Sequence, residues 1–198
     1  MKRVGITGGI GSGKTTVCKI FETLDIPVYY ADVEAKKIMA SSLSVKLQLK
    51  TLLGEAAYHK NGKPDRKYIA SRIFSDKELL SKVNQIIHPA VQDDAERWIE
   101  QNRLKGKLPY VLKEAALLVE NGSYKSLDVL IVVTCPEDIR IKRVMKRDHM
   151  TYAEVLKKVE NQHPESEKIK VADFLIVNDG VRLLIPQVWE IHKKLNFK

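Results

Sequence analysis

The segment GGIGSGKT, Gly8 to Thr15, constrains the fold of this chain more than any other feature. It matches the pattern G-x-x-x-x-G-K-[ST] at every fixed position and follows a short β-branched run, KRVGIT. Five glycines lie between Gly5 and Gly13, although glycine loses more backbone freedom on folding than any other residue. Such a cluster is explained if the backbone wraps closely around an anion. The segment therefore predicts a phosphate-binding loop between a strand and a helix.

Each residue type in this loop suits a bound nucleoside triphosphate. Backbone N–H groups and the positive end of the following helix attract phosphate, and Lys14 can reach the β- and γ-phosphates. The Thr15 hydroxyl can ligate Mg²⁺. The alternative is a glycine-rich turn that contains Lys-Thr by chance. We predict that a nucleoside triphosphate binds at this loop, and the residues in question are Gly8, Gly9, Ile10, Gly11, Ser12, Gly13, Lys14, Thr15 and Thr16.

The rest of the chain alternates strand and helix patterns. Strands are expected at 2–7, 26–32, 108–114, 127–135 and 174–178. Helical spacing of apolar residues predicts helices at 14–24, 136–148, 151–162 and 182–195, and at 45–53, 66–74, 77–87 and 90–102. This alternation predicts an α/β fold, the three-layer core of P-loop NTPases, with a parallel sheet of roughly five strands. The core would comprise 1–31 and 108–198, with a short helical lid at about 140–165, and a helical insert would span 32–107.

Composition and missing motifs exclude several function classes. The net charge is +9, but the basic residues are scattered without a run of five, which indicates solvated surface rather than a nucleic-acid partner. Cys18 and Cys135 are far apart and predict neither a zinc site nor a disulfide. No apolar stretch could span a membrane, so a cytoplasmic location is expected. The D-x-x-G and N-K-x-D strings of GTPase switches do not occur.

A compact P-loop chain with a helical insert is typical of small-molecule kinases, and several segments narrow the choice. These are GITGGIGSGKTTV, VYYADVEAKKI, NGKPDRKYIASRIF, IIHPAV, ALLVENG, RVMKRD, NQHPESEK and ADFLIVNDG. Their order and approximate spacing resemble the dephospho-coenzyme A kinase family over essentially the whole chain. The resemblance implies transfer of the ATP γ-phosphoryl group to the ribose 3′-hydroxyl of dephospho-coenzyme A, with Mg²⁺. It also implies a small-molecule enzyme without nucleic-acid or membrane partners, and we expect a monomer or weak homo-oligomer.

Two alternatives stay open at this point. The first is another small-molecule or nucleoside monophosphate kinase built on the same core. The second belongs to a different class, a nucleotide-binding regulator or nucleic-acid partner that uses the positive charge, and it would show steeply salt-dependent binding to nucleic acid.

Asp32 is the candidate catalytic base. It ends the second predicted strand, where a carboxylate can accept the proton of an attacking hydroxyl or cap the next helix. Position alone does not separate these roles. Resemblance to the family segment DAD favours catalysis and contact with the acceptor. Tyr30 stands where that segment has its first aspartate, so Asp32 is the only carboxylate at this strand end.

Two glutamates follow the third predicted strand. Glu114 lies at its end, where P-loop proteins commonly place a carboxylate near Mg²⁺, and it is the second candidate metal ligand beside Thr15. Glu120 closes ALLVE, which resembles the family segment PLLFE with Ala116 and Val119 replacing proline and phenylalanine. The resemblance implies that Glu120 contacts the acceptor. Surface or helix-cap roles remain open for both glutamates.

Three arginines, Arg140, Arg143 and Arg147, share one helix face by their spacing. Such a stripe is either a solvated face or part of a kinase lid that stabilises the transferring phosphoryl group. Because RVMKRD resembles the lid helix of the family, Arg143 and Arg147 are the catalytic candidates. Arg140 matches less well and is expected on the surface. Lys158 replaces a family arginine and keeps only the charge.

The remaining candidates depend mainly on the resemblance. Arg66 and His88 match family segments that shape the acceptor pocket. From the residues alone, Arg66 would be a surface residue at a helix start and His88 a structural histidine. Asn178 ends the last strand, where the family places residues near adenine, and it also belongs to the turn-forming sequence Asn-Asp-Gly.

Overall fold

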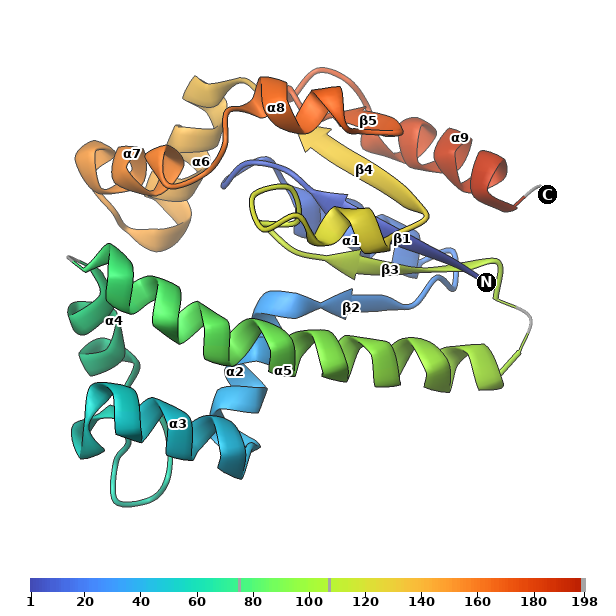
Figure 1. The fold of residues 1–198 in the computed structure, drawn as a ribbon. Coiled ribbons are helices and arrows are strands. Elements are labelled where there is room, and N and C mark those ends of the chain that lie inside the picture. The colour runs from blue at the N-terminus through green and yellow to red at the C-terminus, as the bar shows by residue number, and fades with distance from the viewer. Residues whose placement is uncertain (75, 107, 197–198) are drawn as a thin grey trace. The chain divides into compact units, whose positions relative to one another are not determined.

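The structure is a computed structural model that describes residues 1–74, 76–106 and 108–196 (Figure 1). Contacts divide the chain into two compact units. The first unit, 1–30 with 101–198, contains the β-sheet and is called the sheet unit here. The second unit, 31–100, is formed by helices and is called the helical unit.

The sheet has five parallel strands in the order β2-β3-β1-β4-β5 (Figure 1). This confirms the predicted α/β class and parallel sheet. Because all strands run the same way, their carboxyl ends meet at one edge, where open α/β sheets bind ligands. From β1 the chain first crosses to β2 on one side of β1, and β4 and β5 later lie on its other side. The carboxyl end of β1 is therefore a topological switch point. The strands are β1 (Lys2–Thr7), β2 (Val28–Tyr30), β3 (Tyr110–Glu114), β4 (Val129–Thr134) and β5 (Phe174–Val177).

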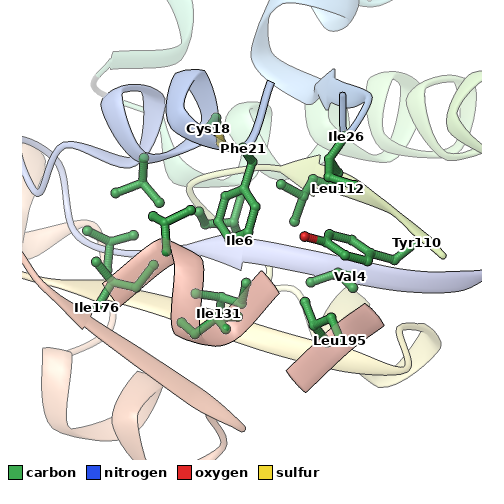
Figure 2. Close-up of a cluster of buried hydrophobic side chains, with 14 residues drawn as sticks. Val4, Ile6, Cys18, Phe21, Ile26, Tyr110, Leu112, Ile131, Ile176 and Leu195 are labelled. Atoms are coloured by element: carbon green, nitrogen blue, oxygen red, sulfur yellow. The ribbon is translucent and has the colours of Figure 1, made fainter. Parts of the chain in front are cut away.

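Helices α1 (Lys14–Glu22) and α9 (Leu184–Asn196) pack on one face of the sheet. Val17, Cys18 and Phe21 of α1 lie at apolar helical spacing and join buried strand side chains in one cluster (Figure 2). The Phe21 and Tyr110 rings meet edge to face at 6.3 Å between centroids. This core fixes the direction in which α1 leaves β1.

A smaller cluster occupies the other face of the sheet. Leu118, Leu130 and Val132 form its buried part, and Tyr124 and Val171 pack against it. Tyr124 belongs to the short helix η2 (Ser123–Ser126), and Val171 follows α8 (Glu165–Lys170). Two further helices, α6 (Glu137–Asp148) and α7 (Tyr152–Glu160), pack together through Ile141, Val144 and Val155. They lie in the segment predicted to form the lid, and we call them the lid helices here, although lid closure stays a prediction.

The helical unit contains α2 (Ala31–Ser41), α3 (Leu43–Leu53), η1 (Glu55–Ala57), α4 (Arg66–Phe74) and most of α5 (Lys77–Leu104). Val45, Leu49 and Leu53 of α3 form a core with Ile69 of α4 and Val83 of α5. The helical patterns expected at 77–87 and 90–102 form a single helix, because α5 continues through Pro89. Apolar side chains on both sides of Pro89 pack into the same cluster. Their burial therefore offsets the hydrogen bond that proline removes from the helix.

Cys18 and Cys135 are both buried and free of a disulfide, as expected. Helix α8 was not predicted, because a six-residue helix is too short to show apolar periodicity. Within the described ranges, no helix is long and apolar enough to cross a membrane.

Candidate functional site

The predicted phosphate-binding loop connects β1 to α1, as expected. Strand β1 ends at Thr7, and α1 begins at Lys14. Gly13 is the N-cap residue of α1 and adopts the left-handed backbone conformation. The loop also closes on itself, because the Ser12 N–H donates to the Gly9 carbonyl at 3.1 Å. The positive end of α1 thus lies at the loop, which suits a bound anion.

Two of the glycines are required by close packing. At Gly13, with φ of +92°, a Cβ atom would collide with Nδ2 of Asn178. At Gly9, a Cβ atom would collide with Nη1 of Arg140. The absence of a side chain at Gly13 and Gly9 therefore allows Asn178 and Arg140 to pack closely against the loop backbone.

Lys14 lies over the loop. Its ammonium group donates to the Gly8 carbonyl at 2.9 Å and to the Gly9 carbonyl at 3.4 Å. These two hydrogen bonds hold the positive charge of Lys14 beside the loop backbone. The Ser12 hydroxyl is fully buried and has no hydrogen-bond partner within the described part of the chain. An unsatisfied buried hydroxyl in this loop fits a site for a polar ligand.

The candidate metal ligands lie at the same edge of the sheet. Thr15 is exposed in the first turn of α1. Glu114 is buried, ends β3 and pairs in register with Ile6 of β1. Across the described ranges, no group of three or more His, Cys, Asp or Glu side chains could hold a metal ion. One hydroxyl and one carboxylate are nevertheless the kind of sparse donor set that suits Mg²⁺ brought in by substrate phosphates.

The two cysteine thiols near this edge stay protonated. Burial raises the pKa of Cys18, and the nearby Glu114 charge raises it further, whereas Lys14 opposes the shift. Burial also raises the pKa of Cys135, against the opposing charges of Arg143 and Arg140. Because the thiolate is the reactive form, neither cysteine is prepared for nucleophilic chemistry.

Asn178 joins the end of β5 to the loop. Its side-chain amide donates to the Ser12 carbonyl at 2.7 Å. Arg143 of α6 donates to the Asn178 carbonyl at 3.2 Å and to its Oδ1 at 3.4 Å. The next residue, Asp179, accepts the N–H groups of Val181 and Arg182 and forms the expected turn. Arg143, Asn178 and Ser12 therefore form one connected chain of contacts at the loop.

Arg147 is placed differently from Arg143, although both belong to α6. Its guanidinium group is exposed and makes two hydrogen bonds to Asp148, at 2.7 and 2.9 Å. These bonds raise the pKa of Arg147 and lower that of Asp148. The structure thus anchors Arg143 to the core and leaves Arg147 at the surface near the end of the helix.

The expectation that Arg140 lies on the surface is wrong. Its side chain is only 7% exposed, and its Nε donates to the Cys135 carbonyl at 3.0 Å. Its Nη2 donates to Oε2 of Glu137 at 3.3 Å. The glycine at position 9 leaves the space that the guanidinium group fills. Arg140 thus packs behind the loop, which a helical-spacing argument alone does not reveal.

Glu120 lies inside the protein rather than at an open surface. Its side chain is 10% exposed, and Oε1 lies 2.5 Å from Nζ of Lys168, which is 1% exposed. The backbone N–H of His163 donates to the same oxygen at 3.2 Å. Oε1 is therefore occupied by partners within the sheet unit, and Glu120 as an acceptor contact stays a prediction.

The other predicted acceptor residues belong to the helical unit. Asp32 is exposed in the first turn of α2, two residues after the end of β2 in the chain, and helix α2 begins before it at Ala31. Arg66 is exposed at the start of α4, which Asp65 caps by accepting the Tyr68 N–H. His88 is exposed on α5. The roles of these three residues stay predictions.

Sequence reasoning missed two side chains at the loop, Gln162 and Lys168. Gln162 accepts the Ile10 N–H at 2.7 Å, and Lys168 pairs with Glu120 as described. Both residues occur in the segment NQHPESEK, which carried the family resemblance. That resemblance was the only available signal, because their partners lie far away in the sequence.

Comparison with known proteins agrees with this geometry. The family model described as Dephospho-CoA kinase matches residues 2–183. Dephospho-CoA kinase from Bacteroides fragilis is 34% identical over 189 residues, which cover 96% of this chain and 90% of the relative. Dephospho-CoA kinase from Porphyromonas gingivalis is 38% identical over 199 residues, which cover 100% of this chain and 96% of the relative.

A solved structure has a similar fold. The crystal structure of a protein from Thermus thermophilus superposes with a TM-score of 0.84 at 30% identity, covering 100% of this chain and 98% of that one. The family match spans the phosphate-binding loop, the helical unit and the lid helices. The chain therefore belongs to the dephospho-CoA kinase family.

Proposed function

We propose that this chain transfers the γ-phosphoryl group of ATP to the ribose 3′-hydroxyl of dephospho-CoA, giving coenzyme A and ADP. This is the last step of coenzyme A synthesis. The observation that carries the proposal is the family match over residues 2–183, which includes both the loop and the helical unit. We propose further that the enzyme acts in the cytoplasm as a monomer or weak homo-oligomer.

The phosphate-binding loop supplies the ATP site. Loop N–H groups and the start of α1 hold the β- and γ-phosphates, while Lys14 neutralises charge at the loop mouth. Asn178, which already bonds to the loop, is the candidate for contact with adenine. Phosphoryl transfer leaves little covalent work to the protein, so alignment and charge stabilisation provide most of the catalysis.

Asp32 is the proposed base. In the reaction, the 3′-oxygen of the acceptor forms a bond to the γ-phosphorus, and the bond from that phosphorus to the bridging oxygen of ADP breaks. The proton of the 3′-hydroxyl moves to the Asp32 carboxylate. Arg66, His88 and Glu120 are the proposed acceptor contacts, which would orient dephospho-CoA for this attack.

Mg²⁺ is the proposed metal, with Thr15 and Glu114 as the protein groups that hold it. When bound, Mg²⁺ neutralises charge on the β- and γ-phosphates. The exposed hydroxyl of Thr15 and the buried carboxylate of Glu114 supply hard oxygen donors, which this ion prefers. Both belong to elements that end or begin at the carboxyl edge of the sheet.

The two lid arginines have separate proposed roles. Arg143 holds Asn178 and so keeps the nucleotide side of the site in place. Arg147 is exposed, and its partner Asp148 is its neighbour in the chain. On closure of the lid, its guanidinium group would exchange Asp148 for the transferring phosphoryl group and stabilise the charge that develops there. Closure would also exclude water and limit hydrolysis of ATP.

An acceptor panel tests the proposed function. ADP release from MgATP would be followed with dephospho-CoA, with a set of nucleoside monophosphates, and without acceptor. We expect release that depends on dephospho-CoA. Turnover only with a nucleoside monophosphate or another metabolite would show that the chain is a kinase with a different acceptor. If no acceptor supports turnover, the proposal fails.

A further inference from the structure

The segment from Gln162 to Lys168 connects three separate parts of the sheet unit, and we call it the strap. Its first residue, Gln162, accepts the N–H of Ile10 in the phosphate-binding loop at 2.7 Å. In its middle, Glu165 accepts the N–H of Cys135 at the end of β4 at 3.3 Å. Its last residue, Lys168, forms the ion pair with Glu120. The proposed reaction assigns no role to the strap.

The ion pair is the most deeply buried contact of the strap. Lys168 is 1% exposed and Glu120 is 10% exposed, so both charges are removed from water at considerable cost. Glu120 also accepts the His163 N–H at 3.2 Å, which ties the beginning of the strap to the same carboxylate. The Glu120 carboxylate therefore contacts His163, which follows Gln162, and Lys168, the last residue of the strap.

The tip of the phosphate-binding loop is held from outside the loop. The Ile10 side chain packs against the cluster of Ile141, Val144 and Val155 in the lid helices. Its N–H is directed to Gln162 on the strap. With its side chain and N–H both engaged, Ile10 anchors the loop, and the conformation of the tip depends on the position of Gln162.

We propose that Lys168 is a positioning residue for the phosphate-binding loop. By fixing Glu120, and through it His163, the Lys168 ammonium holds Gln162 where it accepts the Ile10 N–H. In this proposal Lys168 acts through these residues. The inference rests on the proposed binding of ATP at this loop, but it does not depend on the identity of the acceptor.

The first test compares two lysines of the same short helix. Lys168→Met removes the buried ammonium, whereas Lys170→Met removes an exposed one that pairs with Glu167 on its own helix. Amide hydrogen exchange of a peptide covering the loop would be measured without nucleotide, and the affinity for a non-hydrolysable ATP analogue by calorimetry. We expect Lys168→Met to speed exchange in the loop and to weaken binding about 3- to 10-fold, the effect of roughly one hydrogen bond. Lys170→Met should change neither.

A double-mutant cycle tests whether the effect passes through Gln162. Gln162→Ala alone should also speed exchange in the loop and weaken binding of the analogue. If Lys168 acts through Gln162, adding Lys168→Met to Gln162→Ala should weaken binding by less than about 2-fold. Equal effects of Lys168→Met in both backgrounds would overturn the proposal, since a merely structural lysine would act independently of Gln162.

Two further variants test the proposal if Lys168→Met does not fold. The double variant Lys168→Met, Glu120→Gln leaves no unpaired charge at the buried site, and its thermal unfolding shows whether it is folded. It should weaken binding of the analogue as Lys168→Met does. Unchanged exchange in the loop of this variant, or of Gln162→Ala, would contradict the proposal. Neither readout uses dephospho-CoA, so failure of the proposed acceptor would leave the result interpretable.

Discussion

At the scale of single residues, the loop gains its shape from side chains that come from distant parts of the chain. Asn178 and Arg140 fill the space that Gly13 and Gly9 leave open. Lys14 lies across the loop carbonyls. The glycines at positions 9 and 13 therefore admit supporting side chains, in addition to the proposed role of the loop in binding phosphate.

The proposed base gives the residue-scale prediction. Asp32→Asn removes the proton acceptor but keeps the size of the side chain. We expect ATP binding to stay unchanged and kcat to fall by about 10²- to 10⁴-fold, the usual contribution of a positioned base. Steady-state kinetics with dephospho-CoA, together with calorimetry for ATP, would measure both quantities.

A neighbouring carboxylate on the same helix is the matched control. Glu34 also lies in the first turn of α2 and pairs with Lys37 at 2.8 Å. Glu34→Gln should leave kcat within about 2-fold of the parent, because general-base catalysis needs a carboxylate at the reacting hydroxyl. Turnover of Asp32→Asn within a few-fold of the parent would remove Asp32 from the role of base.

At the scale of elements, the start of α1 is the sensitive point. Gly13→Ala places a Cβ atom against Nδ2 of Asn178 and forces a left-handed backbone on alanine. The backbone strain alone costs roughly 1–2 kcal/mol. We expect a lower Tm and, because the amide of Asn178 must leave the Ser12 carbonyl, at least about 10-fold weaker ATP binding, as the loss of a supported hydrogen bond implies.

Gly106→Ala separates strain from collision. Gly106 also has a positive φ, +74°, but a Cβ atom there meets nothing within 4 Å. This variant should lower the Tm through backbone strain and leave ATP affinity unchanged. Equal ATP affinities for Gly13→Ala and the parent would show that the contact between Asn178 and the loop does not support nucleotide binding.

The same elements show how far the sequence predicts the structure. The strands and the loop were predicted because apolar runs and the glycine pattern are local signals. The apolar spacing also indicates helix on both sides of Pro89, but it does not show that α5 continues through the proline, which depends on tertiary packing of the apolar face of α5. Helix α8 is too short for a periodic signal.

The support of the site was less predictable than its loop. The loop motif names Lys14 and Thr15 directly from their spacing. Gln162 meets Ile10 from 152 residues away along the chain, and Lys168 meets Glu120 from a separate element. Such contacts depend on how helices pack, which spacing along one helix does not describe. For the same reason, Arg140 was assigned to the surface although it is buried.

At the scale of the whole molecule, the sheet unit carries a buried histidine that links acidity to stability. His192 of α9 lies with Nδ1 2.7 Å from the Tyr110 hydroxyl, and its ring stacks on Trp189 at 5.6 Å. Asn196 is near its other nitrogen. Burial lowers the pKa of His192 below its usual 6.5. The folded protein therefore favours the neutral ring.

The sign of the pH dependence follows from this shift. As pH falls below about 6.5, the unfolded chain binds a proton at His192 before the folded chain does, so stability falls. We expect the Tm to drop less between about pH 7.5 and pH 5.5 in His192→Phe than in the parent. An equal drop in His192→Phe would contradict this assignment.

The most direct test of the account is the position of the transferred phosphate. The parent and Lys14→Met would be incubated with MgATP and dephospho-CoA, and the product would be identified by mass and by the phosphorus NMR signal of its ribose phosphate. We predict coenzyme A, phosphorylated at the 3′-hydroxyl, from the parent, and at least about 100-fold slower formation by Lys14→Met, as expected for loss of one charge-stabilising group. Phosphate at another position, or no product from the folded parent, would contradict the account.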